Sequence, residues 1–103
     1  YMRILTEDII QKMPTLYSQE QVQDPVCVLK IFTPDNAWTW YVVEGQLQED
    51  GDWIFFCKVV SPACPEGELG YVLLSELQSI RGALGLPVER DLYFKDKPLS
   101  QCK

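Results

Sequence analysis

The dipeptide Asp50-Gly51, which stands between two long runs of strand-forming residues, constrains the fold of this chain most strongly. Asp-Gly favours a tight turn between antiparallel strands, because glycine adopts a positive φ without steric cost. The run before it covers residues 38–48 and the run after it covers residues 52–60, and both are rich in aromatic and β-branched side chains. This pattern predicts a β-hairpin, with Gly45 marking a bulge in its first strand.

Two further segments extend the hairpin. Residues 26–33 are rich in strand formers and are joined to the hairpin by the turn signal Pro34-Asp35-Asn36-Ala37. Residues 88–94 place Val88, Arg90 and Leu92 on one side and Glu89 and Asp91 on the other, and we expect a last strand there. Residues 61–70 contain several prolines and glycines, and we expect a loop there.

Two short helices are predicted beside these strands. Thr6 is a suitable N-cap for a helix over residues 7–13, which Pro14 ends. The capping-box pattern that starts at Ser75 predicts a second helix to about Arg81, with Gly82 at its exit. The length of 103 residues fits a single domain, residues 1–103. The fold class is therefore α+β, an antiparallel meander of about four strands with two short flanking helices.

Both faces of the predicted sheet are apolar. Because side chains alternate along a strand, Trp40 and Phe55 belong to one face of their strands, and Tyr41 and Phe56 belong to the other. A sheet with one face in water shows polar residues on that face. We therefore expect both faces to be covered, and Tyr41 to be a contact residue if its side of the sheet is open.

The charge is acidic and unevenly distributed. The net charge is −6, and residues 1–80 carry four basic and twelve acidic side chains, a net of −8. Residues 81–103 carry five basic and three acidic side chains, a net of +2. An acidic body repels phosphate backbones, which argues against direct nucleic-acid binding and favours a basic protein partner. With no leader pattern and no apolar run long enough for a bilayer, we expect a cytoplasmic chain without membrane contact.

Catalytic and metal-binding patterns are missing from the sequence. The chain has no histidine, which excludes nucleophilic pairs that use a histidine base. The four cysteines, Cys27, Cys57, Cys64 and Cys102, lack the close pairs of a structural zinc site. We expect reduced thiols, with a bond between Cys27 and Cys57 left open. No catalytic residue, metal or cofactor is predicted, and a role other than an enzyme is favoured.

Charged residues of the C-terminal region are the candidate binding residues, together with Tyr41. Arg90 is phased with apolar neighbours and needs a partner if buried. We expect it either to pair with an acidic side chain of another segment or to bind an anion in a pocket with Arg81. Glu89 and Asp91 lie two residues apart and face the same way on the predicted strand, which suits a solvated strand face better than the carboxylate pair of a glycosidase.

The sequence also resembles a bacterial family, the one catalogued as domain of unknown function 2958. The resemblance covers nearly the whole chain, and its most specific part is residues 82–94. It is carried by Thr33-Pro34-Asp35, Trp38-Thr39-Trp40-Tyr41-Val42, Leu69-Gly70-Tyr71, Leu74, Glu76-Leu77, Ile80-Arg81-Gly82 and Leu84-Gly85-Leu86-Pro87-Val88-Glu89-Arg90-Asp91-Leu92-Tyr93-Phe94. The resemblance implies an accessory protein of plasmids, conjugative elements or phages, with no established activity to transfer.

Three hypotheses for function follow. The first is a non-catalytic protein-binding domain that a mobile element uses with a host complex. The second is a binder of a small anionic ligand, or an enzyme, with a pocket near Arg81, Glu89 and Arg90. The third, a protein associated with nucleic acid, fits the acidic charge least.

Overall fold

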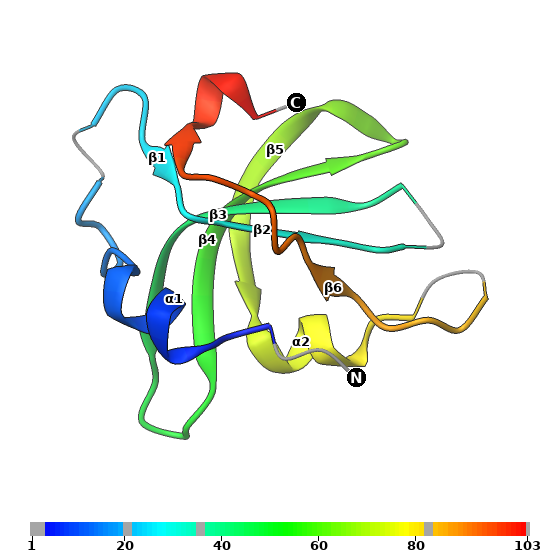
Figure 1. The fold of residues 1–103 in the computed structure, drawn as a ribbon, viewed down its shortest axis with the longest axis horizontal. Coiled ribbons are helices and arrows are strands. Elements are labelled where there is room, and N and C mark those ends of the chain that lie inside the picture. Colours follow the sequence, from blue (N-terminus) through cyan, green and yellow to red (C-terminus); the bar gives the residue numbers. More distant parts are fainter. Residues whose placement is uncertain (1–3, 20–21, 35–36, 82–83, 103) are drawn as a thin grey trace.

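A five-stranded antiparallel sheet forms the body of the protein in the computed structural model, which describes residues 4–19, 22–34, 37–81 and 84–102 (Figure 1). Its strand order is β5-β4-β3-β2-β6, and a separate two-stranded sheet pairs β1 with β7. The strands are β1 (Val26–Cys27), β2 (Leu29–Phe32), β3 (Thr39–Leu47), β4 (Trp53–Ser61), β5 (Cys64–Leu73), β6 (Glu89–Arg90) and β7 (Lys97–Pro98). The helices are α1 (Glu7–Lys12), α2 (Leu74–Ser79) and the 3-10 helix η1 (Leu99–Gln101).

The predicted hairpin is present as β3 and β4, and Gly51 has the positive φ of 88° that its turn requires. The bulge lies elsewhere than predicted, because the register shifts between Val42 and Glu44. Gly45 instead allows a close approach of the Phe55 ring. A Cβ atom at Gly45 would lie 2.8 Å from Cδ1 of Phe55 and 3.1 Å from Cγ of Met13.

The loop predicted over residues 61–70 is wrong, because most of it belongs to β5. This strand has ten residues and pairs with β4 from Ser61↔Cys64 to Ile54↔Leu73. Proline is tolerated on an edge strand, where its missing N–H need not join a ladder, and β5 carries Pro65. The meander therefore has four strands, β2 to β5, and the whole fold has more strands than predicted.

The C-terminal strand is shorter than predicted. Only Glu89 and Arg90 pair with β2, and the chain turns out into solvent afterwards, where Leu92 is 58% exposed.

The second helix starts earlier than predicted. Its N-cap is Leu73, whose N–H donates to the Glu76 carboxylate at 2.9 Å. The predicted exit at Gly82 lies outside the described residues, as do Asp35 and Asn36 of the predicted turn.

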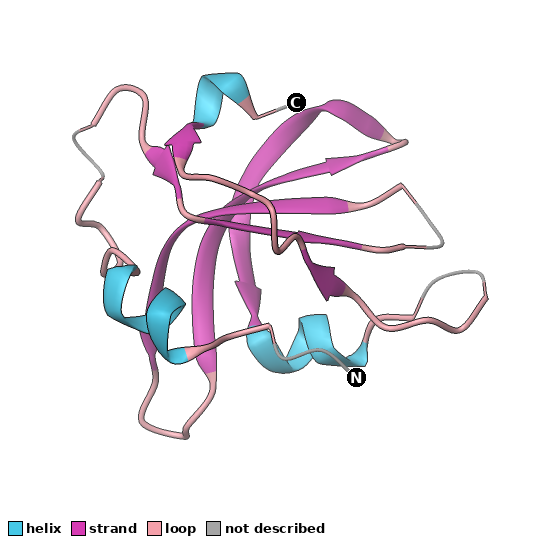
Figure 2. Ribbon diagram, viewed as in Figure 1, coloured by secondary structure: helices cyan, strands magenta, loops and turns pink. Residues whose placement is uncertain are grey.

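The first face of the sheet carries the larger core. Trp40 and Phe55 are buried there beneath Ile9 of α1 and Leu77 of α2, as the alternation of the strands predicts. Figure 2 shows both α-helices toward one side of the view and the small β1–β7 sheet toward the opposite side. The N-terminal segment and α2 thus cover this face of the sheet.

The second face is covered by the C-terminal segment. Tyr41 and Val43 of β3 are buried there with Cys27 and Cys102, and Leu99 packs against this cluster. The β1–β7 pair brings the C-terminal segment over β3. The C-terminal segment does not cover β5, where Leu69 and Tyr71 are exposed. The expectation that both faces of the sheet are hidden therefore holds over β3 but not over β5.

Candidate functional site

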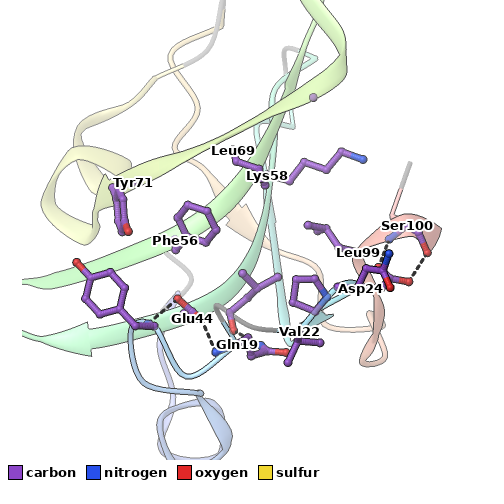
Figure 3. Close-up of a pocket in the computed structure, with 15 residues that line it drawn as sticks. Gln19, Val22, Asp24, Glu44, Phe56, Lys58, Leu69, Tyr71, Leu99 and Ser100 are labelled. Atoms are coloured by element: carbon purple, nitrogen blue, oxygen red, sulfur yellow. Dashed lines mark hydrogen bonds between the residues drawn. The ribbon is translucent and has the colours of Figure 1, made fainter.

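A groove of about 570 Å³ lies on the second face of the sheet, where the C-terminal cover stops (Figure 3). We call it the Tyr71 groove. Its walls come from β3, β4 and β5, from the segment before β1, and from η1. The lining residues are Tyr17, Gln19, Val22, Gln23, Asp24, Pro25, Val43, Glu44, Phe56, Lys58, Gly67, Leu69, Tyr71, Leu99 and Ser100.

One wall of the groove is apolar and exposed. The Phe56 ring of β4 and the Tyr71 ring of β5 are register partners, with centroids 5.0 Å apart and planes tilted by 52°. Leu69 follows on the same face of β5, because side chains alternate along a strand. Leu69 is 62% exposed and Tyr71 is 52% exposed. Figure 3 shows the three side chains along the β4–β5 side of the groove.

The opposite wall is a loop that a buried carboxylate holds in place. Glu44 of β3 is 4% exposed, and its two oxygens accept the N–H groups of Tyr17 at 2.9 Å and Gln19 at 2.8 Å. The Gln19 side chain donates to the Val43 carbonyl at 2.8 Å. Tyr17 has a φ of 68°, a left-handed conformation that tyrosine rarely adopts. Glu44 therefore sustains a strained backbone that presents Tyr17 to the groove.

The far end of the groove is closed by polar contacts between the segment before β1 and η1. Ser100 donates to Asp24 through its hydroxyl at 2.6 Å and through its N–H at 3.0 Å. These bonds hold the pKa of the Asp24 carboxyl below its usual range. Lys58 donates to the Cys102 carbonyl at 3.2 Å. These contacts fix the groove's end without placing a reactive group in it.

Three sequence-predicted site residues, Glu89, Arg90 and Asp91, meet elsewhere, in a hollow of about 410 Å³ beside Trp38. We call it the Trp38 hollow. Asp91 pairs with Lys30, whose Nζ lies 3.7 Å from the carboxylate, and also accepts the Tyr93 N–H at 2.9 Å. The carboxylate is thus engaged within the protein.

Arg90 contacts the N-terminal segment. Its guanidinium donates to the Thr6 hydroxyl at 2.7 Å, and Thr6 in turn donates to Asp8. The Thr6 bond, with a smaller contribution from the charge of Arg90, lowers the pKa of Asp8. Arg81 lies apart from this cluster, and its guanidinium donates to the carbonyls of Gln78 and Ile80 at 2.8 Å. Arg90 lines the Trp38 hollow, and Arg81 is not among the residues that line it.

Tyr41 is 4% exposed and lies under the C-terminal segment, 6.4 Å from the Phe94 ring by centroid. Its role as a contact residue depended on an open face, and at this position the face is closed. Burial raises the pKa of its hydroxyl. The open part of the same face is two strands away, at Tyr71.

The described residues contain no group of three or more side chains suited to hold a metal ion. The four cysteines are free thiols, and Cys27 lies in one cluster with Cys102 rather than beside Cys57. Burial raises the pKa of Cys57 to about 12 and also raises the pKa of Cys27.

No helix in the described ranges is long and apolar enough to cross a membrane.

The sequence contained a signal for the groove that the loop prediction obscured. Gly67, Leu69 and Tyr71 stand at alternate positions, which is the spacing of one strand face. Two large apolar side chains at that spacing indicate a half-covered strand. No comparable signal marked Glu44, because its partners are backbone N–H groups more than twenty residues away.

Fold and groove together define a small α+β domain with an exposed apolar surface on its sheet. The chain belongs to the family described as Protein of unknown function (DUF2958), which matches residues 4–102. No curated protein matches the chain, and no solved structure matches it.

Proposed function

We propose that this chain is a non-catalytic protein-binding domain and that the Tyr71 groove is its binding surface. The observation that carries the proposal is the exposure of Leu69 and Tyr71 beside the groove, 62% and 52% respectively. Exposed aromatic and aliphatic side chains that border a concave surface are typical of protein contact sites. The net charge of −6 favours a partner with a basic surface.

The biological setting is also part of the proposal. The family resemblance supports an accessory role for a bacterial plasmid, phage or conjugative element, acting in the cytoplasm beside a host protein complex. An acidic domain without a reactive cluster in its groove suits such a role.

Affinity capture from bacterial lysate, quantified by mass spectrometry, tests the proposal. The baits are the wild-type chain, the double variant Leu69→Ser/Tyr71→Ser, and the control Tyr93→Ser, which changes a side chain 92% exposed and outside the groove. We expect a protein that wild type and control enrich equally and that the double variant loses. Equal enrichment by all three baits, or none above empty resin, would show that the groove is not a protein-binding surface.

The Trp38 hollow supports a second candidate function, the binding of a small anionic ligand. Arg90 and Lys30 line this hollow beside the side chain of Trp38, which is 39% exposed. Thermal shift with inorganic phosphate and with small carboxylates tests it, because a ligand that binds only the native state raises the midpoint. A rise that Arg90→Met and Lys30→Met abolish supports this function, and no rise contradicts it.

A further inference from the structure

The outer edge of β5 is an open side of the sheet. β5 is the last strand in the order β5-β4-β3-β2-β6 and pairs, within the described ranges, with β4 alone. At the other end of the sheet, β2 is partly covered by β6. The regular part of this edge strand runs over residues 68–73, because the β4–β5 register shifts between Val59 and Ser61, and it presents backbone groups that another extended segment can pair with.

The same strand forms one wall of the Tyr71 groove. Leu69 and Tyr71 point into the groove from β5, as Figure 3 shows. At Gly70, between them, an added Cβ would meet nothing within 4 Å, so that side of the strand is also uncovered. A segment paired with β5 would place its alternate side chains beside Leu69 and Tyr71 and bury their exposed area.

The charged residues of β5 indicate which kind of segment would pair with this edge. Glu68 is exposed and alternates with Leu69 and Tyr71 in the regular part of β5, so it lies on the opposite face of the strand. Glu66 is also exposed and lies beyond Gly67, where the register with β4 shifts and Gly67 has a positive φ of 89°. Neither glutamate takes part in an ion pair in the part of the chain that the structure describes. A partner strand with lysine or arginine at every second position would place one cation beside Glu68, and Glu66 would add a second negative charge nearby.

A second copy of this chain suits the edge poorly. Two β5 strands that paired would bring four exposed carboxylates together, in two molecules that each carry −6. Like charges on neighbouring strands are destabilising. Glu66 and Glu68 therefore favour a basic strand and oppose self-association.

We propose that β5 binds an extended segment of a partner protein, in which apolar and basic side chains alternate, as an additional strand of the sheet. This inference rests on the proposed function and names its partner class. The backbone of β5 supplies the pairing, Leu69 and Tyr71 contact the apolar side chains, and Glu66 and Glu68 attract the basic ones.

The test uses a synthetic nine-residue peptide that alternates valine and lysine, labelled for fluorescence anisotropy. We expect binding at low salt that weakens as salt rises, and about tenfold weaker binding by Glu66→Lys/Glu68→Lys. The control Glu7→Lys/Glu49→Lys makes the same charge change at two exposed positions away from β5 and should keep most of the affinity. Equal loss in both variants would show that only net charge matters and would overturn the proposal.

Backbone pairing is tested with two N-methylated forms of the peptide. An added strand pairs with β5 through alternate residues, so methyl groups on one alternate set of nitrogens should abolish binding and those on the other set should not. Equal tolerance of both forms, or a peptide-independent dimer in light scattering, would overturn strand addition. Capture of a partner that needs Leu69 and Tyr71 would then still support protein binding through the groove by another mode.

Discussion

At the residue scale, Glu44 is the buried polar group on which the groove depends. We expect Glu44→Gln to destabilise the protein by about 1–3 kcal/mol, because an amide has one acceptor oxygen and its NH2 group would face a second N–H donor. The urea midpoint measures the loss, and faster hydrogen exchange at the Tyr17 and Gln19 amides locates it. Glu49→Gln, at an exposed position of the β3–β4 turn, is the control. Equal midpoints for the two variants would contradict the role given to Glu44.

The second prediction at this scale concerns Gly45. We expect Gly45→Ala to cost about 1–3 kcal/mol, because the added methyl would lie 2.8 Å from the Phe55 ring in a packed core. Gly70→Ala is the matched control, since its methyl meets nothing within 4 Å, and a change of no more than about 0.5 kcal/mol is expected there. Urea unfolding of both variants checks this, and a smaller loss at Gly45 than at Gly70 would contradict it.

Individual residues were predictable where the cause was local. The turn at Gly51 and the burial of Trp40 follow from dipeptide chemistry and from alternation. The role of Gly45 was not predictable, because the reason for a glycine there is the Phe55 ring on the neighbouring strand. The position of Arg90 was predicted only in part. It does contact another segment, since its guanidinium donates to the Thr6 hydroxyl, and the expected bond to an acidic side chain stays a prediction.

At the scale of elements, β5 shows why a segment rich in glycine and proline can still be a strand. Local composition predicted a loop, yet β4 offers β5 a long ladder and an apolar neighbour at Phe56. Tertiary pairing of this kind overrides weak local propensity. Local composition does not predict the groove for the same reason, because it predicts a loop where the strand of the exposed wall lies.

The start of α2 gives a prediction at this scale. Asp52, in the β3–β4 turn, accepts the Ser75 hydroxyl at 2.6 Å and the Ser75 N–H at 3.1 Å. These bonds lower the pKa of the Asp52 carboxyl, so their contribution is present at neutral pH and lost as pH falls through the folded-state pKa. Asp52→Ala should lower the urea midpoint at pH 7, by an amount that shrinks in acid. Glu49→Ala should leave it unchanged, and a pH-independent effect of Asp52→Ala would contradict this account.

At the scale of the whole molecule, the two apolar faces were predictable and their covers were not. Alternation in β3 and β4 assigned Trp40 and Tyr41 to opposite faces, and both are buried. The pairing of β1 with β7 joins segments about seventy residues apart in the sequence, and no local sequence pattern predicts it. That pairing decides which part of the second face is covered, and therefore where the groove lies.

Because thiols are buried in both cores, we expect the protein to lose folding stability at alkaline pH. Burial raises the pKa of Cys57 from 9.0 to about 12, and it also raises the pKa values of Cys27 and Cys102. Above pH 9 the unfolded thiols ionise while the folded ones keep their protons. The unfolded state then binds fewer protons, so stability is complete below pH 9 and falls as pH rises, by up to about 1.4 kcal/mol per pH unit for Cys57 and in the same direction for Cys27 and Cys102.

Urea unfolding between pH 7 and 10.5, with reductant present, measures this decline. Cys57→Ala should be less stable than wild type at pH 7, because it leaves a small cavity in the core, but should lose stability less steeply above pH 9. Val59→Ala, which shortens a side chain packed against the same core and leaves every thiol in place, should also lower stability at pH 7 but should keep the wild-type slope. Parallel pH profiles for wild type and Cys57→Ala would mean that the Cys57 thiol ionises as readily in the folded protein as in the unfolded chain, and that the β4 core is open to water.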